Sequence, residues 1–165
     1  MNRPGGITFD SAGNAYFSEY NGQRVRKVTP GGIVTTLATG LNGGPWGVVV
    51  DAAGNVYTGE FNSSRRLLKI APTGTVSTLL VDSGGPISLG LRNGKVVYAT
   101  YYGCQVKEYD VDAVPIAGLT NTCSSTGDGG AAINATLHNP SGLAIAPDGA
   151  IVVTTLSGHR VRRIG

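Results

Sequence analysis

The sequence repeats itself with a period of 41 residues, and this period limits the folds open to the chain. The segment PGGITFDSAGNAY that starts at Pro4 returns as PWGVVVDAAGNVY at Pro45, and Pro86 starts a third, weaker copy. Pro140 starts a fourth copy after an insertion at 119–138. Periods of about 40–45 residues are typical of β-propeller blades or of helical repeats. We therefore expect one domain over residues 1–165, with repeats at approximately 4–44, 45–85, 86–139 and 140–165.

The composition of each copy favours strands over helices. The chain has 26 glycines and 8 prolines in 165 residues, and only 14% of its residues are charged. In the first copy the pattern predicts four short strands, at 6–10, 15–19, 24–29 and 33–39, separated by turns rich in glycine and asparagine. Four antiparallel strands per unit, stacked radially, are the design of a propeller. We predict an all-β fold, a β-propeller built from four four-stranded blades.

The fourth copy ends differently from the others. It reaches residue 165 after its third strand, and residues 1–3 alone precede the first strand of the first copy. The last blade is therefore expected to lack its outer strand, which leaves a sheet edge open to association. We expect the chain to be part of a longer propeller, or to complete its propeller with further copies as a homo-oligomer.

The recurring residues resemble a known repeat. The patterns Pro-x-Gly-(Ile/Val/Leu), Asp-x-x-Gly-Asn and Arg-Val-x-(Lys/Arg)-(Val/Ile) are similar to those of NHL-repeat β-propellers. The segment from Gly127 to Leu143 resembles an element of bacterial secreted NHL proteins, whereas the third copy departs from the pattern with RNGK at 92–95. The resemblance implies a propeller and leaves its function open, because this fold hosts binders, scaffolds and enzymes alike.

One face of such a propeller collects the turns between second and third strands together with the connections between blades. Aromatic and amide side chains fall on these segments, and loops on a rigid scaffold are suited to recognition. The alternative is that the aromatic rings pack between the blades. The candidate binding residues are Tyr20, Gln23, Trp46, Phe61, Asn62, Tyr101, Tyr102 and His159.

Two glutamates offer the beginning of a metal-ion or catalytic site. Glu19 and Glu60 are 41 residues apart, and the FSE segment that ends at Glu19 resembles an element of virginiamycin B lyase-type propellers. Related lactonase propellers hold a metal ion with carboxylates, so the resemblance implies a divalent cation as a possible cofactor. The alternative is that both carboxylates bind turn amides or repeat arginines. A general base would have to be His138 or His159, and both fit turn positions.

Two further motifs have structural explanations. Asp10, Asp51 and Asp148 fall in the first turns of their copies, where an Asx-turn explains them better than calcium binding, because Asp-x-x-Gly-Asn supplies too few oxygens. The Gly-Asp-Gly-Gly segment at 127–130 lacks the lysine of a phosphate-binding loop, so a nucleotide site is disfavoured.

The net charge is +3, and basic residues recur on the predicted third strands. Some NHL domains bind RNA through a basic loop face, which makes RNA binding an alternative implied by the resemblance. These side chains are expected to form ion pairs or to bind carbonyl groups, so a nucleic-acid partner is disfavoured. The residues are Arg24, Arg26, Lys27, Arg65, Arg66, Lys69, Arg160, Arg162 and Arg163.

The two cysteines fall on turns of the same predicted face. Cys104 lies at the turn after the second strand of the third copy, and Cys123 lies in the insertion, so the thiols can meet. We predict a disulfide, with two free buried thiols as the alternative. An even cysteine count in a chain of low charge suits an oxidising compartment, and no apolar run reaches about 18 residues. We expect an extracellular or periplasmic location and no membrane span.

These observations predict a non-catalytic extracytoplasmic module that binds a protein, peptide or glycan through its loop face. The alternatives are a lyase-like or lactonase-like enzyme with a metal ion at the central channel, a self-assembling structural subunit, and an RNA-binding NHL domain. Bound metal in the channel would favour the enzyme, and salt-sensitive binding to RNA would favour the last alternative.

Overall fold

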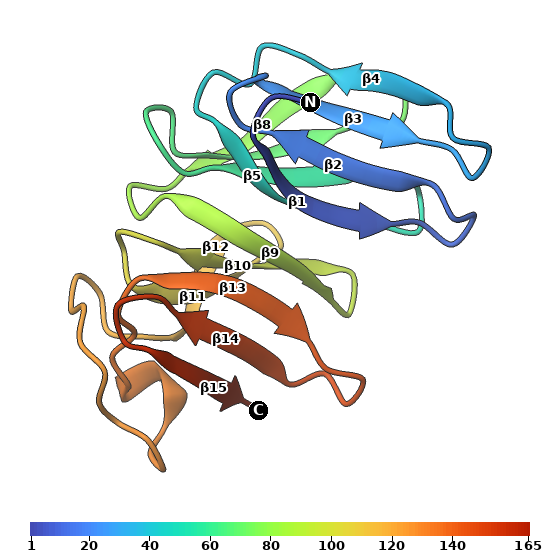
Figure 1. The fold of residues 1–165 in the computed structure, drawn as a ribbon. Coiled ribbons are helices and arrows are strands. Elements are labelled where there is room, and N and C mark those ends of the chain that lie inside the picture. The colour runs from blue at the N-terminus through green and yellow to red at the C-terminus, as the bar shows by residue number, and fades with distance from the viewer. The chain divides into compact units, whose positions relative to one another are not determined.

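The computed structural model describes all residues 1–165 and consists almost entirely of antiparallel strands (Figure 1). The strands form four sheets in the order of the chain, with four, four, four and three strands. The predicted all-β propeller fold of four blades is confirmed, and so is the absence of a fourth strand from the last blade. The strands are β1 (Pro4–Phe9), β2 (Ala15–Glu19), β3 (Arg24–Val28), β4 (Val34–Ala38), β5 (Pro45–Val50), β6 (Val56–Glu60), β7 (Arg66–Ile70), β8 (Val76–Val81), β9 (Pro86–Arg92), β10 (Lys95–Thr100), β11 (Gln105–Tyr109), β12 (Ala113–Ala117), β13 (Pro140–Ile145), β14 (Ile151–Thr155) and β15 (Arg160–Ile164).

The only helix is the three-residue 3-10 turn η1 (Ala132–Asn134). It is far too short to cross a bilayer, so the structure contains no membrane-spanning helix.

The Asp-x-x-Gly-Asn motif builds the turn between the first two strands of a blade. The Asp10 carboxylate accepts hydrogen bonds from the backbone of Ala12 and Asn14, the Asn14 amide and the Tyr16 hydroxyl, at 2.8–3.0 Å. Gly13 takes φ +81°, which a residue with a Cβ rarely adopts. The hydrogen bonds from Asn14 hold the pKa of Asp10 below its usual value. The predicted Asx-turn is therefore present.

Asp51 repeats this network 41 residues later, and Asp148 does not. Ala53, Asn55 and Tyr57 donate to Asp51 at 2.8–3.1 Å. In the fourth copy Ala146 takes the place of the turn aspartate, since its backbone makes the equivalent hydrogen bonds. Asp148 stands two residues further along the turn and makes an Asx hydrogen bond of its own, because its carboxylate accepts from the Ala150 amide at 3.1 Å.

The third copy turns by a different route. Its first two strands pair up to Arg92 and Lys95, which leaves a two-residue turn of Asn93 and Gly94. Both residues have positive φ, 51° and 78°, as the tight turns of β-hairpins require. The RNGK segment therefore replaces the aspartate turn without changing the strand order.

The chain divides into two compact units, Met1–Asp82 and Ser83–Gly165, each with two blades and a core of its own. The core of unit 1 joins side chains from the first two blades, and that of unit 2 joins the last two. The buried residues of unit 1 are Tyr16, Val25, Ala38, Leu41, Val48, Val56, Leu68 and Ile70. Those of unit 2 are Val97, Val106, Ala117, Leu137, Ile151 and Val153. The four sheets fall inside the predicted repeats, and the single domain over 1–165 stays a prediction.

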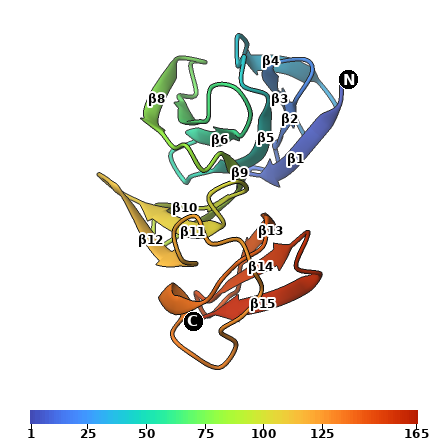
Figure 2. The same ribbon diagram turned by 90° about the vertical axis from the view of Figure 1, so that its left-hand side faces the viewer.

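The segment between β12 and β13 runs beside β15 in both views (Figures 1 and 2). Arg162 fixes it there, because its guanidinium donates to the carbonyl oxygens of Thr126 and Thr136 at 2.8 and 2.6 Å and to Asp128 at 2.6 Å. Arg160 also pairs with Asp128, at 3.2 Å. The insertion that lengthens the third repeat thus packs along the last strand of the fourth.

Candidate functional site

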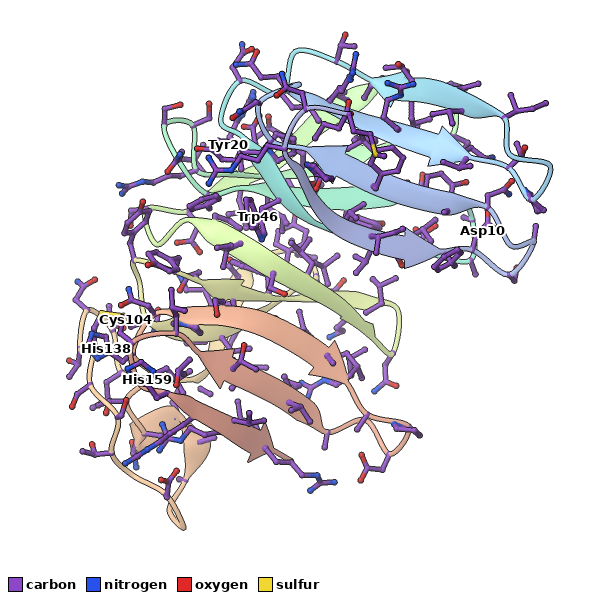
Figure 3. All side chains as sticks on the ribbon, viewed as in Figure 1. Asp10, Tyr20, Trp46, Cys104, His138 and His159 are labelled. Carbon is purple, nitrogen blue, oxygen red and sulfur yellow. A yellow bond between two sulfur atoms is a disulfide. The ribbon has the colours of Figure 1, made fainter.

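The turns that follow β2 and β6 meet the connection between the two blades at one end of unit 1. Backbone hydrogen bonds tie these segments together, from the Leu41 amide to the Gln23 carbonyl at 3.0 Å and from the Asn62 amide to the Gly43 carbonyl at 3.2 Å. Figure 3 shows Tyr20 and Trp46 at this end of unit 1 and Asp10 at the opposite end. The predicted gathering of turns and connections on one face is therefore present in this unit.

Three aromatic rings meet at this end of unit 1. Tyr20, Trp46 and Phe61 form a triangle in which the ring centroids are 5.8–5.9 Å apart. Trp46 meets the other two rings edge-on, at 78° and 80°, a geometry that aromatic pairs prefer. All three residues are half-buried, and each ring packs against the other two.

Polar groups surround this aromatic cluster, which we define as Tyr20, Trp46 and Phe61. The guanidinium carbon of Arg3 lies 4.4 Å from the Tyr20 ring centroid and 5.6 Å from that of Trp46, within the range of cation–π attraction. The Asn62 side-chain amide donates to the Tyr20 hydroxyl. Gln23 is exposed on the adjoining turn. An aromatic surface with a cation and amides at its rim can bind planar, hydroxylated or carbonyl-bearing groups.

Gly44 explains how the tyrosine reaches this position. A Cβ at Gly44 would lie 2.3 Å from the Tyr20 ring, so the tyrosine packs directly on the backbone before β5. Gly44 also has φ +74°, and Arg3 takes φ 53° at the corresponding place before Pro4. The position of Arg3 is the feature that sequence reasoning missed. The residue before the first proline of a repeat was the available signal.

The two glutamates at the ends of β2 and β6 are fully buried and bound by arginine and backbone amides. Glu60 accepts from Arg66 Nε at 2.6 Å and Nη2 at 3.0 Å, and from the Gly43 amide at 3.1 Å. Glu19 accepts from Arg24 and from the Asn2 amide. The Arg24 hydrogen bond holds the pKa of Glu19 below its usual value, and the Glu60 hydrogen bond raises that of Arg66.

These carboxylates do not fit a metal-ion site. A divalent cation such as calcium takes six to eight oxygen ligands, and several of them usually come from acidic side chains. The structure contains no group of three or more His, Cys, Asp or Glu side chains that could hold an ion. Each glutamate already has its oxygens bound to arginine and amide donors.

The equivalent place in the other two blades carries no carboxylate. In the third blade Thr100 and Gln105 replace the glutamate and arginine, and the Gln105 amide donates to the Gly118 carbonyl and to Thr120 at 3.1 and 3.0 Å. In the fourth blade Arg160 pairs with Asp128 from the insertion instead. The Gly-Asp-Gly-Gly segment thus supplies an ion-pair partner that the blade itself lacks.

In unit 2 the disulfide joins the turn after β10 to the insertion. Cys104 and Cys123 are bonded with their Cα atoms 5.3 Å apart, so the predicted disulfide is present and the alternative of free thiols is wrong. Tyr101 and Tyr102 lie beside it with ring centroids 5.1 Å apart, edge to face. Unit 2 therefore brings two of the candidate binding residues together at a crosslinked turn.

The histidines lie in unit 2 and do not form a cluster with acidic side chains. His159 is exposed in the turn between β14 and β15, and His138 is half-buried before β13. His159 has φ 49°, as Gln23, Arg65 and Cys104 also have positive φ at the same place before the third strand of their blades. His159 is thus explained as a turn residue of the repeat, and a binding role for it stays a prediction.

The fold defines the chain as a β-propeller of four blades. No family model matches the sequence, and no curated protein matches it. Solved structures do match. Virginiamycin B lyase from Staphylococcus aureus has a TM-score of 0.68 and 16% identity over 98% of this chain and 55% of its own.

Two other solved structures are similar to the chain. A gluconolactonase from Xanthomonas campestris has a TM-score of 0.75 and 17% identity over 99% of this chain and 58% of its own. An auxiliary nutrient binding protein from Bacteroides thetaiotaomicron has a TM-score of 0.74 and 14% identity over 98% and 47%. The chain spans about half the length of these structures. At such identities the likeness establishes the fold alone, and in that respect the resemblance to virginiamycin B lyase-type propellers is confirmed.

Proposed function

We propose that the chain is a non-catalytic, extracytoplasmic binding module that holds a peptide, protein or glycan partner on the aromatic cluster of unit 1. The observation that carries this proposal is the meeting of three rings, 5.8–5.9 Å apart, under the guanidinium of Arg3. Aromatic and arginine side chains are the groups that most often dominate binding surfaces. The name of the nutrient binding protein with a similar fold agrees with a binding role.

The chemistry of the chain supports a binding role over a catalytic one. The buried glutamates are bound by arginines, and the two histidines stand on turns without an acidic partner cluster. We expect addition of calcium or zinc, followed by chelator, to leave the melting temperature unchanged. A reversible rise in melting temperature on addition of either ion would revive the lyase-like or lactonase-like alternative.

The disulfide supports the proposed compartment. Structural disulfides such as that of Cys104 and Cys123 are typical of oxidising compartments, such as the periplasm or the outside of the cell. Its persistence can be checked by alkylation of the protein immediately after it is isolated from its native compartment. Rapid labelling of both thiols would count against an extracytoplasmic location.

The proposal is tested with glycan and peptide arrays and two matched variants. Arg3→Ala removes the cation over Tyr20, whereas Lys27→Ala removes a cation over Tyr16, 5.3 Å from its ring, on the third strand. We expect the wild-type protein to bind a restricted set of glycans or peptides. Arg3→Ala should weaken that binding about fivefold or more, as loss of an arginine contact from a binding surface predicts, and Lys27→Ala should not.

Two results would contradict the proposal. One is the absence of binding to either array at high protein concentration. The other is equal binding by the wild type and Arg3→Ala, which would place the ligand away from the aromatic cluster. Which array responds decides whether the partner is a polypeptide or a glycan.

A further inference from the structure

Two sheet faces, one on the first blade and one on the last, expose apolar side chains that the repeat elsewhere buries. On β1, Ile7 is 62% exposed and Phe9 is 65% exposed. On β15, Val161 is 71% exposed. Large apolar side chains at such exposure on regular strands mark a surface that is built for contact.

The repeat shows what these residues do when they are covered. Val48 stands 41 residues after Ile7, at the same place on the first strand of its blade, and is 5% exposed. It packs in one cluster with Val25, which is fully buried on the third strand of the preceding blade. Val50, the equivalent of Phe9, packs against the same cluster.

Unit 2 contains the same interface between its two blades. Leu143 and Ile145 on β13 are the equivalents of Ile7 and Phe9, and both pack against the cluster that contains Val106. Val106 is fully buried and stands where Val25 stands in its own blade. The interface within each unit therefore joins a first-strand pair of apolar residues to a third-strand valine.

The exposed residues are the two unfilled halves of this interface. Val161 occupies the valine position, because it pairs with Thr154 as Val25 pairs with Ser18. Ile7 and Phe9 occupy the first-strand positions. The first blade carries the inserting half, Ile7 and Phe9, and the last blade carries the receiving half around Val161. A single chain therefore exposes two surfaces that are complementary to each other.

The receiving half has the required space. In unit 2 Leu143 and Ile145 pack where a Cβ at Gly90 would lie 2.8 Å from either side chain, so a small residue is needed beneath them. The equivalent position on β13 is Ala144, which is exposed and carries only a methyl group. The half-buried Val152, in the place of Val97, completes an apolar seat with Val161.

We propose that the occupant of these faces is a second copy of this chain, bound head to tail, with Ile7 and Phe9 of one copy on Ala144, Val152 and Val161 of the other. The complementarity to the interfaces within the chain carries this assignment. A contact between two different faces closes into a ring when the rotation permits it.

The test is the molar mass in solution, measured by sedimentation equilibrium across a range of concentrations. The wild type is expected to form a dimer of twice the 16.9 kDa chain. Phe9→Glu and Val161→Glu should each weaken the dimer at least about tenfold, as loss of one buried apolar side chain predicts. The control is Val111→Glu, at a turn position that is 81% exposed and on neither face, which should leave the dimer intact.

Mixing the two variants tests the head-to-tail geometry. A mixed dimer of Phe9→Glu and Val161→Glu retains one wild-type interface, so the mixture should associate more strongly than either variant alone. A wild type that stays monomeric at all concentrations would overturn the proposal and leave the faces to further blades of a longer chain. Dimerisation that both substitutions leave unchanged would also overturn it.

Discussion

The ion pair of Glu60 and Arg66 is expected to stabilise the end of the second blade at which β6 turns into β7. Glu60 is fully buried and accepts three hydrogen bonds, two from Arg66 and one from the Gly43 amide. In Glu60→Gln the side-chain amide would point donors at the donors of Arg66. Breaking a buried pair costs about 3–5 kcal/mol, and the 29% exposure of the arginine side chain reduces this to about 2–3 kcal/mol.

The assay is urea and thermal unfolding followed by the emission of Trp46, the only tryptophan, which lies in the same unit. At about 2–4 °C per kcal/mol, Glu60→Gln should lower the melting temperature by about 5–10 °C. Arg66→Gln should cost a similar amount, and the double variant should cost at least about 1 kcal/mol less than the sum, because two glutamines can pair. Additive costs, or a single variant that melts within about 2 °C of the wild type, would refute the reasoning.

Three further predictions concern titration, the crosslink and a glycine. Burial raises the pKa of Asp51, but hydrogen bonds from the turn, led by those of Asn55, outweigh it and lower the pKa overall. The contribution of Asp51 to the stability of the fold is therefore present above about pH 4 and is lost as the pH falls through the pKa of the folded state. Asp51→Asn should flatten the fall in urea midpoint between about pH 5 and pH 2. Reduction of Cys104–Cys123 should destabilise unit 2 by about 3 kcal/mol, measured by tyrosine near-ultraviolet dichroism with and without reductant, and an unchanged midpoint would contradict this. Gly43→Ala would place a Cβ 2.6 Å from a glutamate side chain and should cost about 1–3 kcal/mol, whereas Gly31→Ala, with ordinary spacing around it, should stay within about 0.5 kcal/mol in the same unfolding assay.

Most of the fold could be predicted because the pattern of strands and turns recurs in four copies. The 41-residue shift and the turn residues place the strands to within about two residues, and the missing outer strand follows from the residues after Arg160. The predicted start of the first strand at residue 6 was late, because Pro4 pairs with Glu19 across a bulge before the regular register begins at Ile7. Bulges depend on the packing of neighbouring strands, which a turn pattern does not reveal.

The candidate site was predictable in its residues and not in their contacts. The repeat placed Tyr20, Trp46 and Phe61 on one face, but the triangle of rings depends on the bare backbone at Gly44. The place of Arg3 beside these rings could not be predicted, because Arg3 precedes the first repeat. It also has a positive φ, which its residue type does not favour.

The two glutamates show which ion pairs the sequence predicts and which it does not. Their spacing by one repeat suggested a shared site, yet Glu19 and Glu60 each bind an arginine five or six residues further along their own blade. A pairing across one turn is local, and the alternative that both carboxylates bind turn amides or repeat arginines is confirmed. The partner of Arg160 could not be predicted, because Asp128 comes from the insertion.

The most direct test of the binding role is the emission of Trp46 during titration with the best ligand from the arrays. Trp46 lies within the aromatic cluster, 5.8 and 5.9 Å from its two neighbours, so a ligand seated there must change its environment. We expect a saturable change in emission with the same dissociation constant as direct binding, and about a fivefold weaker constant in Arg3→Ala. Binding that leaves the Trp46 emission unchanged would show that the ligand sits elsewhere and would contradict the proposed function.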